Sequence, residues 1–327
     1  MRRRVFVRGL CATLAAVPFV GLGQGAKRVG VLTPLPDDAE AQREMSGFRE
    51  ELRRLGWREG DNLIVHYRST GGDFARVKPL AKEIVALKPD VIMSRTTPAS
   101  AALLEETRSI PIVFVAVSDP VGDKIVSSLA RPRGNVTGFI NVEDSLGGKY
   151  LELLKEVAPS LAHVGVIFNP KTAPGGGKYH LPLVEKAGAA MGIRVTATPV
   201  HDADQTERAI NALASQAHSG LVVIPDAANV ANRKRIIAAV ARHRLPAIYP
   251  IPAFIDDGGL MSYGTNIADL YRRSAGYIDR ILRGAKPADL PVQAPEKFDL
   301  TINTKTAKAL GIAIPRSLLL RADRIIE

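Results

Sequence analysis

Short polar motifs in this sequence stand where apolar runs rich in Val and Ile end and helical patterns begin. Ser94 follows one such run, and Thr96 and Thr97 come directly after it. A helix that starts there carries free backbone N–H groups and the positive end of its dipole, which together suit an anion. We therefore interpret this segment as a candidate binding loop for a carboxylate or a similar group.

Other strand ends carry the same kinds of side chain. Ser118 and Asp119 close the next apolar run, and Asn169 and Asp226 close two runs in the second half of the chain. Each could simply cap a helix, which is the common use of Ser, Thr, Asn and Asp at such places. As a set that converges on one cleft, they predict a ligand shell with hydroxyl donors on one side and carboxylates on the other.

The motifs of common enzymes are missing from the sequence. The segment 175–178 (GGGK) is followed by Tyr179 and lacks the first glycine of a P-loop, so we interpret it as a loop before a helix. Neither Gly-x-Gly-x-x-Gly nor Gly-x-Ser-x-Gly occurs, and the histidines show no metal-ligand spacing. We expect a protein that is not an enzyme, with no catalytic residue, no metal and no cofactor.

The first residues have the pattern of a secretory signal. Arg2, Arg3, Arg4 and Arg8 precede an apolar stretch, and small residues follow at 21 and 23. The apolar stretch is shorter than the ~20 residues that span a bilayer, which argues against a membrane anchor. We predict a cleaved signal peptide over residues 1–23. Acylation at Cys11 is the alternative, and the choice between the general and the twin-arginine export route stays open.

The amino-acid composition of the chain limits its domain organisation and the classes of partner that it is expected to bind. The chain has 327 residues, of which 46% are hydrophobic and 24% charged, so it is large enough for one or two globular domains. Loss of residues 1–23 removes four of the 44 basic residues and none of the 33 acidic ones, which leaves a net charge of +7. The densest basic patch, 233–235 with 242–244, contains no aromatic residue, so we interpret it as a solvated helix face and expect no nucleic-acid partner.

The order of the predicted elements favours an α/β fold. The apolar runs 29–32, 63–65, 91–93 and 112–116 alternate with helical patterns. Strand and helix in regular alternation predict a parallel sheet with helices on both faces. The pattern then begins again, because residues 28–32 (RVGVL) resemble 163–167 (HVGVI), and residues 110–112 (IPI) resemble 245–247 (LPA), both at an offset of 135. The sequence therefore predicts two similar doubly wound lobes.

Several phrases together carry a resemblance to a known family. They are 110–114 (IPIVF), 118–122 (SDPVG), 134–138 (GNVTG), 259–264 (GLMSYG), 284–291 (GAKPADLP) and 302–311 (INTKTAKALG). With them the chain resembles, over essentially its whole length, the exported solute-binding proteins of ABC importers whose better-studied relatives take up aromatic amino acids. The resemblance implies the type I periplasmic-binding fold, in which two α/β lobes joined by a multi-strand hinge hold the ligand between them.

The resemblance also implies a division of the chain and a set of ligand contacts. Lobe 1 would comprise residues 27–141 plus about 264–289, and lobe 2 residues 142–263 plus about 290–327 with the hinge crossovers. The implied ligand-binding residues include Tyr263 beside those already named, and the full set is Ser94, Thr96, Thr97, Ser118, Asp119, Asn169, Asp226 and Tyr263. Arg95 departs from the small residue often found there, and it could narrow the pocket or favour a more acidic ligand.

The resulting expectation is a monomeric periplasmic protein that captures a small organic solute, an amino acid or a related carboxylate. It would deliver that solute to an ABC permease in the membrane. A ligand-sensing protein for a receptor is one alternative, and an exported enzyme of the cleft type is another. The effector domain of a repressor would need a DNA-binding helix-turn-helix at the N-terminus, where this chain has a signal pattern instead.

Overall fold

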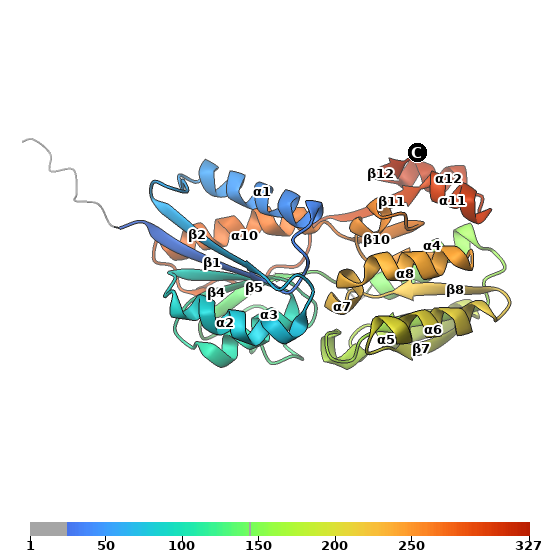
Figure 1. The fold of residues 1–327 in the computed structure, drawn as a ribbon, viewed down its shortest axis with the longest axis horizontal. Helices are drawn as coiled ribbons and strands as arrows, with labels where there is room; N and C mark the ends of the chain where they lie inside the picture. Colours follow the sequence, from blue (N-terminus) through green and yellow to red (C-terminus); the bar gives the residue numbers. More distant parts are fainter. Residues whose placement is uncertain (1–24, 144) are drawn as a thin grey trace, which may run out of the picture.

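The computed structural model describes residues 25–143 and 145–327, so the predicted signal peptide 1–23 and Cys11 lie outside the described residues. Figure 1 shows two α/β lobes side by side, each built on a sheet with helices on both faces. The predicted fold class, two parallel-sheet lobes joined by several connections, is confirmed. No helix in the described part of the chain is both long enough and apolar enough to cross a membrane.

The first sheet has the order β2-β1-β3-β4-β5, and all its neighbouring strands are parallel. Its strands are β1 (Lys27–Thr33), β2 (Leu63–Ser69), β3 (Val91–Arg95), β4 (Ile112–Val117) and β5 (Val136–Ile140). Its helices are α1 (Ala39–Arg54), η1 (Phe74–Arg76), α2 (Val77–Ala86) and α3 (Thr96–Glu106). In Figure 1, α1 lies on one face of this sheet, and α2 and α3 lie on the other.

The second sheet has the order β12-β11-β10-β9-β8-β6-β7, in which only β10 and β11 run antiparallel to each other. Its strands are β6 (His163–Phe168), β7 (Arg194–Pro199), β8 (Ser219–Val223), β9 (Ala247–Tyr249), β10 (Met261–Thr265), β11 (Phe298–Asn303) and β12 (Arg324–Ile326). Helix α4 (Leu146–Val157) precedes β6, and the other helices of this lobe are η2 (Pro174–Gly177), α5 (Leu181–Met191), α6 (Ala203–Ala214), α7 (Ala227–Ala231), α8 (Arg233–Arg242), α9 (Ala253–Asp256), α11 (Thr304–Leu310) and α12 (Arg316–Arg321).

The internal repeat corresponds to a shared strand order. The segment 28–32 lies in β1 and the segment 163–167 in β6, and each of these strands sits between the next two strands of its own lobe. The order β2-β1-β3-β4 in the first lobe therefore matches β7-β6-β8-β9 in the second. Strands β10, β11 and β12 extend the second sheet beyond the repeat.

Helix α10 (Ile267–Leu282) returns the chain to the first lobe, where it packs on α1 and on β3, β4 and β5. After η3 (Pro287–Asp289), Gln293 pairs with β5, because its backbone N–H donates to the carbonyl of Gly138 at 2.9 Å. The chain then joins the second sheet as β11. The crossovers thus lie between β5 and α4, between β10 and α10, and between Gln293 and β11. The lobe boundaries at 141, 264 and about 290 stay a prediction.

Local sequence explains how these elements start and stop, and α1 is a good example. The Asp38 carboxylate accepts from the backbone N–H groups of Glu40 and Ala41, so it caps the first turn. Met45, Phe48 and Leu52, spaced three and four residues apart, are buried against the sheet. Helix α1 follows β1 in the chain. The loop between them, which carries Leu35, therefore lies at the carboxyl end of β1, beside the space between the lobes.

Candidate functional site

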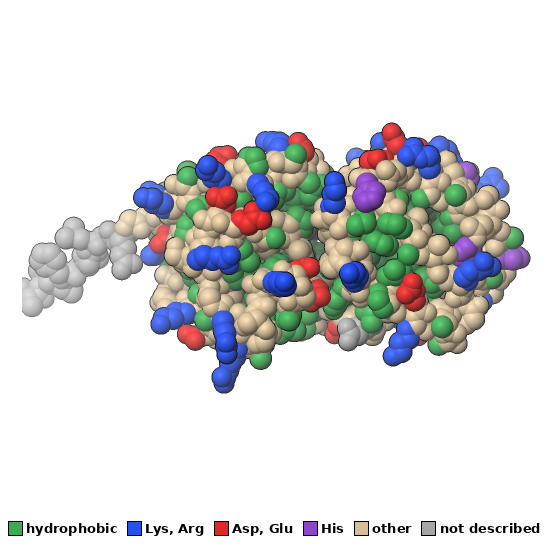
Figure 2. Space-filling view, turned by 90° about the horizontal axis from the view of Figure 1, so that it is seen from below, with side chains coloured by type: hydrophobic (Ala, Val, Ile, Leu, Met, Phe, Trp, Pro, Cys, Tyr) green, Lys and Arg blue, Asp and Glu red, His purple; other side chains and the backbone are tan. Residues whose placement is uncertain are grey.

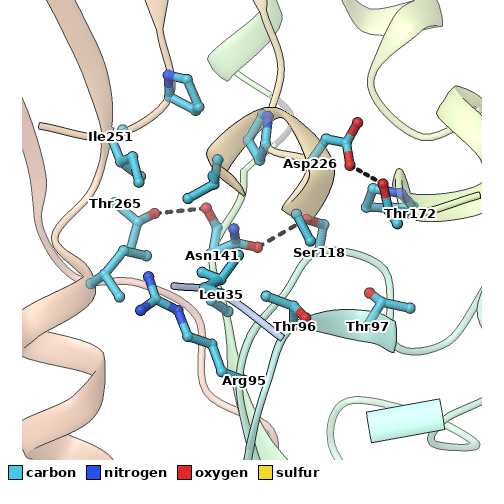
Figure 3. Close-up of a pocket in the computed structure, with 18 of the residues that line it drawn as sticks. Leu35, Arg95, Thr96, Thr97, Ser118, Asn141, Thr172, Asp226, Ile251 and Thr265 are labelled. Atoms are coloured by element: carbon cyan, nitrogen blue, oxygen red, sulfur yellow. Dashed lines mark hydrogen bonds between the residues drawn. The ribbon is translucent and has the colours of Figure 1, made fainter. Parts of the chain in front are cut away.

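A cavity lies between the two lobes at the carboxyl ends of their strands, as expected for a doubly wound sheet. It holds about 620 Å³ of empty space, a volume that includes its open mouth. The side chains that line it come from both lobes and from the crossovers (Figure 3). The wall is mainly apolar, with Leu35, Leu146, Val230, Ile251 and Ile267 beside several prolines.

The first lobe contributes the start of α3 to this wall. Thr96 and Thr97 both line the cavity, and Arg95, the residue before the helix, makes no side-chain capping bond. The first backbone N–H groups of a helix have no acceptor within the helix, so those of Thr96 and Thr97 are available to a ligand. The Oγ1 atom of Thr96 is also buried without a hydrogen-bond partner among the described residues.

The backbone of the first lobe is strained at two positions in the cavity wall. Thr96 has φ of 72°, and Ala116 has φ of 58° at an irregularity of β4. Residues other than glycine rarely adopt such left-handed conformations, and they cluster at functional sites when they do. Both residues line the cavity, so the strain lies where the wall is shaped rather than at a remote turn.

Arg95 lines the cavity, but its charge already has a partner inside the protein. Its Nη2 donates to Oε1 of Glu44 at 3.0 Å, its Nη1 donates to the other oxygen, and both side chains are buried. The guanidinium also lies over the ring of Tyr271, 5.5 Å from the ring centre. Burial acts to lower the pKa of Arg95, but Glu44 and Tyr271 together outweigh burial and hold this pKa above its ordinary value.

The second lobe contributes a carboxylate that has no cationic partner within the described residues. Asp226 is 4% exposed and caps α7, with Oδ1 accepting from the N–H of Ala228 at 3.0 Å and from the hydroxyl of Thr172. Its Oδ2 accepts from the N–H of Asn169 at 2.6 Å. Burial raises the pKa of Asp226 above its ordinary value, although these hydrogen bonds oppose the shift.

Asn141, in the crossover between β5 and α4, joins Ser118 and Thr265 in the part of the cavity wall that we call the floor. Asn141 follows β5, and its Oδ1 accepts from the hydroxyl of Ser118 at 2.9 Å. Its backbone carbonyl accepts from the hydroxyl of Thr265, at the end of β10, at 2.7 Å. Figure 3 shows these bonds side by side at the centre of the cavity. The floor is therefore tied to two of the crossovers that connect the lobes.

Ionic and hydrogen-bonding contacts also join the two lobes directly. Arg233, at the start of α8, donates from Nη2 to Asp38 of the first lobe at 2.6 Å and from Nε to Asp257 at 2.7 Å. The N–H of Gly175 in η2 donates to Oδ1 of Asp123 in the first lobe at 3.1 Å. These contacts hold the lobes together in the arrangement seen here.

The interpretation of the basic patch as a solvated helix face agrees with the exposure of Lys234, Arg235 and 242–244, and it is wrong for Arg233 alone. Its side chain is buried between two acids, so it is a structural cation and not part of a solvated surface. Arg235 and Arg242, further along α8, are exposed but paired with Glu207. On the face drawn in Figure 2, basic and acidic side chains are scattered over both lobes with a groove between them.

The structure brings together four of the predicted ligand-binding residues and leaves the other four outside the cavity wall. Thr96, Thr97, Ser118 and Asp226 line the cavity. The ligand contacts of all eight stay predictions, and the positions of the remaining four have local explanations. Ser94 is fully buried and its hydroxyl bonds to that of Ser100 at 2.8 Å.

The other three residues outside the wall have structural roles. Oδ1 of Asp119 accepts from the N–H of Gly122 at 2.8 Å, which closes the turn after β4. Asn169 acts through its backbone N–H, which supports Asp226. The ring of Tyr263 stacks on Phe298 with centres 6.0 Å apart, so it packs within the second lobe and not on the cavity.

The cavity also contains polar residues that the sequence did not indicate: Asn141, Tyr150, Thr172 and Thr265. Thr172 follows the strand end at Asn169 and could have been included with it. Tyr150 has the helical spacing of a core residue with Leu146 and Leu154, so no pattern distinguishes it. In residues 25–143 and 145–327, no group of three or more His, Cys, Asp or Glu side chains is placed to hold a metal ion.

Two lobes that enclose a mainly apolar cavity with a few convergent polar groups define a two-lobed solute-binding protein. Comparison with known families agrees, since the model of the family described as ABC transporter substrate binding protein matches residues 28–326. The chain belongs to this family.

Individual relatives extend the comparison. A curated protein named tyrosine-binding protein, from Clostridioides difficile (strain R20291), is 25% identical over 290 residues, which are 88% of this chain and 81% of that protein. A crystal structure of an ABC domain in complex with L-Trp from Streptococcus pneumonia is 25% identical, with a TM-score of 0.84 over 92% of this chain and 100% of that one. A conserved domain protein from Vibrio cholerae O1 biovar eltor is 28% identical with the same TM-score and coverage.

Proposed function

We propose that this protein is the exported, periplasmic substrate-binding component of an ABC importer and that its solute is an amino acid with a large apolar side chain. It would bind the solute unaltered in the cavity between the lobes and deliver it to a membrane permease. Membership of the substrate-binding family supports the class, and the relatives named for tyrosine and crystallised with L-Trp support the type of solute. We further propose that the protein works as a monomer, without cofactor, nucleic acid or catalysis.

The observation that carries the proposal is the division of polar groups between the lobes. The first lobe offers backbone N–H groups at the start of α3, which suit a carboxylate. The second lobe offers the Asp226 carboxylate, which has hydrogen-bond donors but no cation among the described residues, and which suits an ammonium group. An amino acid carries both groups, and the apolar wall between them suits a large side chain.

Arg95 favours the same conclusion. Both of its terminal nitrogens donate to Glu44, so its counter-charge is part of the protein and does not have to come from the ligand. A dicarboxylate would need a cation besides Arg95, and Arg95 is the only cationic side chain that lines the cavity within the described residues. The site therefore suits a zwitterion better than an acidic ligand.

Isothermal titration calorimetry on the mature protein tests this proposal. L-tryptophan, L-tyrosine and L-phenylalanine should bind, and the matched probes tryptamine and indole-3-propionate, which lack the carboxylate and the ammonium group respectively, should bind far more weakly than L-tryptophan. Equal binding of tryptamine would contradict the role of the α3 N-terminus. Chemical conversion of a bound amino acid, detected by mass spectrometry of the recovered solute, would contradict the role of a carrier.

A further inference from the structure

The second lobe places in the cavity wall a tyrosine whose hydroxyl has no hydrogen-bond partner among the described residues. Tyr150 in α4 lines the cavity, and the residue is 1% exposed. Its hydroxyl has no hydrogen-bond partner among the described residues. Buried polar side-chain groups in folded proteins are nearly always paired. Because Tyr150 lines the cavity, a polar atom of the ligand is the candidate partner for this hydroxyl.

A second tyrosine shows that burial alone would not support this argument. Tyr249 is also fully buried, and its hydroxyl is also without a partner in the described part of the chain. Its ring stacks on Phe254, with centres 4.9 Å apart, and it does not line the cavity. The two tyrosines therefore differ in one relevant respect, which is access to the space where the solute would bind.

The groups around Tyr150 explain what its hydroxyl is free to do. The ring packs among apolar residues of the second lobe that include Leu146 and Leu154, so it is held in place. Burial raises the pKa of Tyr150, so the hydroxyl stays protonated and can both donate and accept a hydrogen bond. The carboxylate and ammonium groups of an amino acid have other partners in the cavity, at the start of α3 and at Asp226.

We propose that the Tyr150 hydroxyl is a specificity-determining group that forms a hydrogen bond with a polar atom in the side chain of the bound solute. This inference rests on the proposed function, because it assumes that the cavity holds an amino acid. It refines the solute class to large side chains with a hydroxyl or a ring N–H, and it disfavours a purely hydrocarbon side chain. A side chain without such a group would leave the Tyr150 hydroxyl buried and unpaired.

The test compares Tyr150→Phe with the matched control Tyr249→Phe. Each variant removes one buried hydroxyl and keeps the ring, so neither opens a cavity. Calorimetry with L-tyrosine, L-tryptophan and L-phenylalanine should show that Tyr150→Phe weakens binding of the first two by about 3- to 10-fold, as expected for a neutral hydrogen bond. Binding of L-phenylalanine should change by less than about twofold, and Tyr249→Phe should leave all three affinities unchanged.

Thermal unfolding without ligand separates this role from a structural one. Because the Tyr150 hydroxyl bonds to none of the described residues, the midpoint for Tyr150→Phe should be no lower than that of the wild type. Unchanged affinities in Tyr150→Phe would overturn the inference, and an equal loss for all three amino acids would overturn the assignment to the side chain. A wild type that binds none of the three would instead refute the proposed function, and this inference with it.

Discussion

The two buried charges in the cavity wall are balanced in different ways. Arg95 in the first lobe forms an ion pair with Glu44, so its charge is balanced within the protein, while its Nε has no hydrogen-bond partner among the described residues. Asp226 in the second lobe has hydrogen bonds from Asn169, Ala228 and Thr172, but no cation among the described residues. A charge that is balanced internally can support the fold without a ligand. A buried carboxylate with only neutral donors is better placed to be balanced by what binds.

The largest expected effect comes from breaking the internal pair. Glu44→Ala leaves the guanidinium of Arg95 buried without its carboxylate, which should lower the free energy of unfolding by about 3–5 kcal/mol. Urea denaturation measures this change. The matched control is Glu51→Ala on the same helix, because Glu51 pairs with the exposed side chain of Arg54 and its loss should cost no more than about 1 kcal/mol.

A double variant sharpens the same point. Glu44→Leu combined with Arg95→Met removes both charges and keeps most of the volume, so it should recover most of the stability that Glu44→Ala loses. If the double variant is as unstable as Glu44→Ala, the loss has another cause than the unpaired guanidinium.

The next effect concerns the charge that we assign to ligand binding. Asp226→Asn should weaken binding of L-tryptophan by roughly 10- to 100-fold, the value of a hydrogen bond to a charged group. Binding of indole-3-propionate, which has no ammonium group, should stay as weak as in the wild type. Calorimetry on both ligands checks this, with thermal unfolding as the control for folding. Unchanged affinity for L-tryptophan would remove Asp226 from the ligand shell.

The pH dependence of stability is a smaller and gradual test of the internal pair. Burial raises the pKa of Glu44 from an ordinary value of 4.5 to about 7, against the attraction of Arg95. Between these values the folded protein binds more protons at Glu44 than the unfolded chain does. The contribution of this group to the free energy of unfolding should therefore fall as pH rises from about 4.5 to about 7.

Urea denaturation at several pH values measures that decline, and Glu44→Gln should flatten it. Asp226 and Asp123 have raised pKa values as well, so part of the slope should remain in this variant. An identical slope in the wild type and in Glu44→Gln would show that Glu44 does not titrate in this range.

The smallest expected effect is at the floor of the cavity. Ser118→Ala removes the donor to Asn141, a neutral hydrogen bond worth about 0.5–1.5 kcal/mol, and leaves the crossover less firmly held. L-tryptophan should bind about 2- to 10-fold more weakly when measured by calorimetry. A loss as large as that of Asp226→Asn would mean that Ser118 contacts the charged end of the ligand directly.

The sequence predicts much of the fold because the two lobes repeat a simple pattern. Alternating apolar runs and helical spacing indicate β1, α1 and β3, and the offset of 135 residues relates β1 to β6. The antiparallel pairing of β10 with β11 has no counterpart in the repeat. Such a pairing depends on which sheet edge is free, and that is a property of the assembled lobe rather than of a local pattern.

The site is predictable where it depends on strand ends and unpredictable where it depends on packing. Thr96, Thr97, Ser118 and Asp226 follow strands, and the edge of a parallel sheet brings such residues to one cavity. Tyr150 has the spacing of a core position, and only the assembled lobes reveal that the residue lines the cavity with an unpaired hydroxyl among the described residues. Tyr263 has an aromatic ring at a strand position, but its stacking on Phe298 takes it away from the cavity.

The return of α10 to the first lobe has a consequence for synthesis. The sheet of strands β1 to β5 is complete once residue 140 has left the ribosome, yet α10, which packs on three of those strands, ends at Leu282. Until then the face of that sheet that carries α1 lacks its second covering helix, and exposed apolar faces promote aggregation. A nascent chain of this protein should therefore need a chaperone over much of its length, and the N-terminal lobe should not fold to completion first.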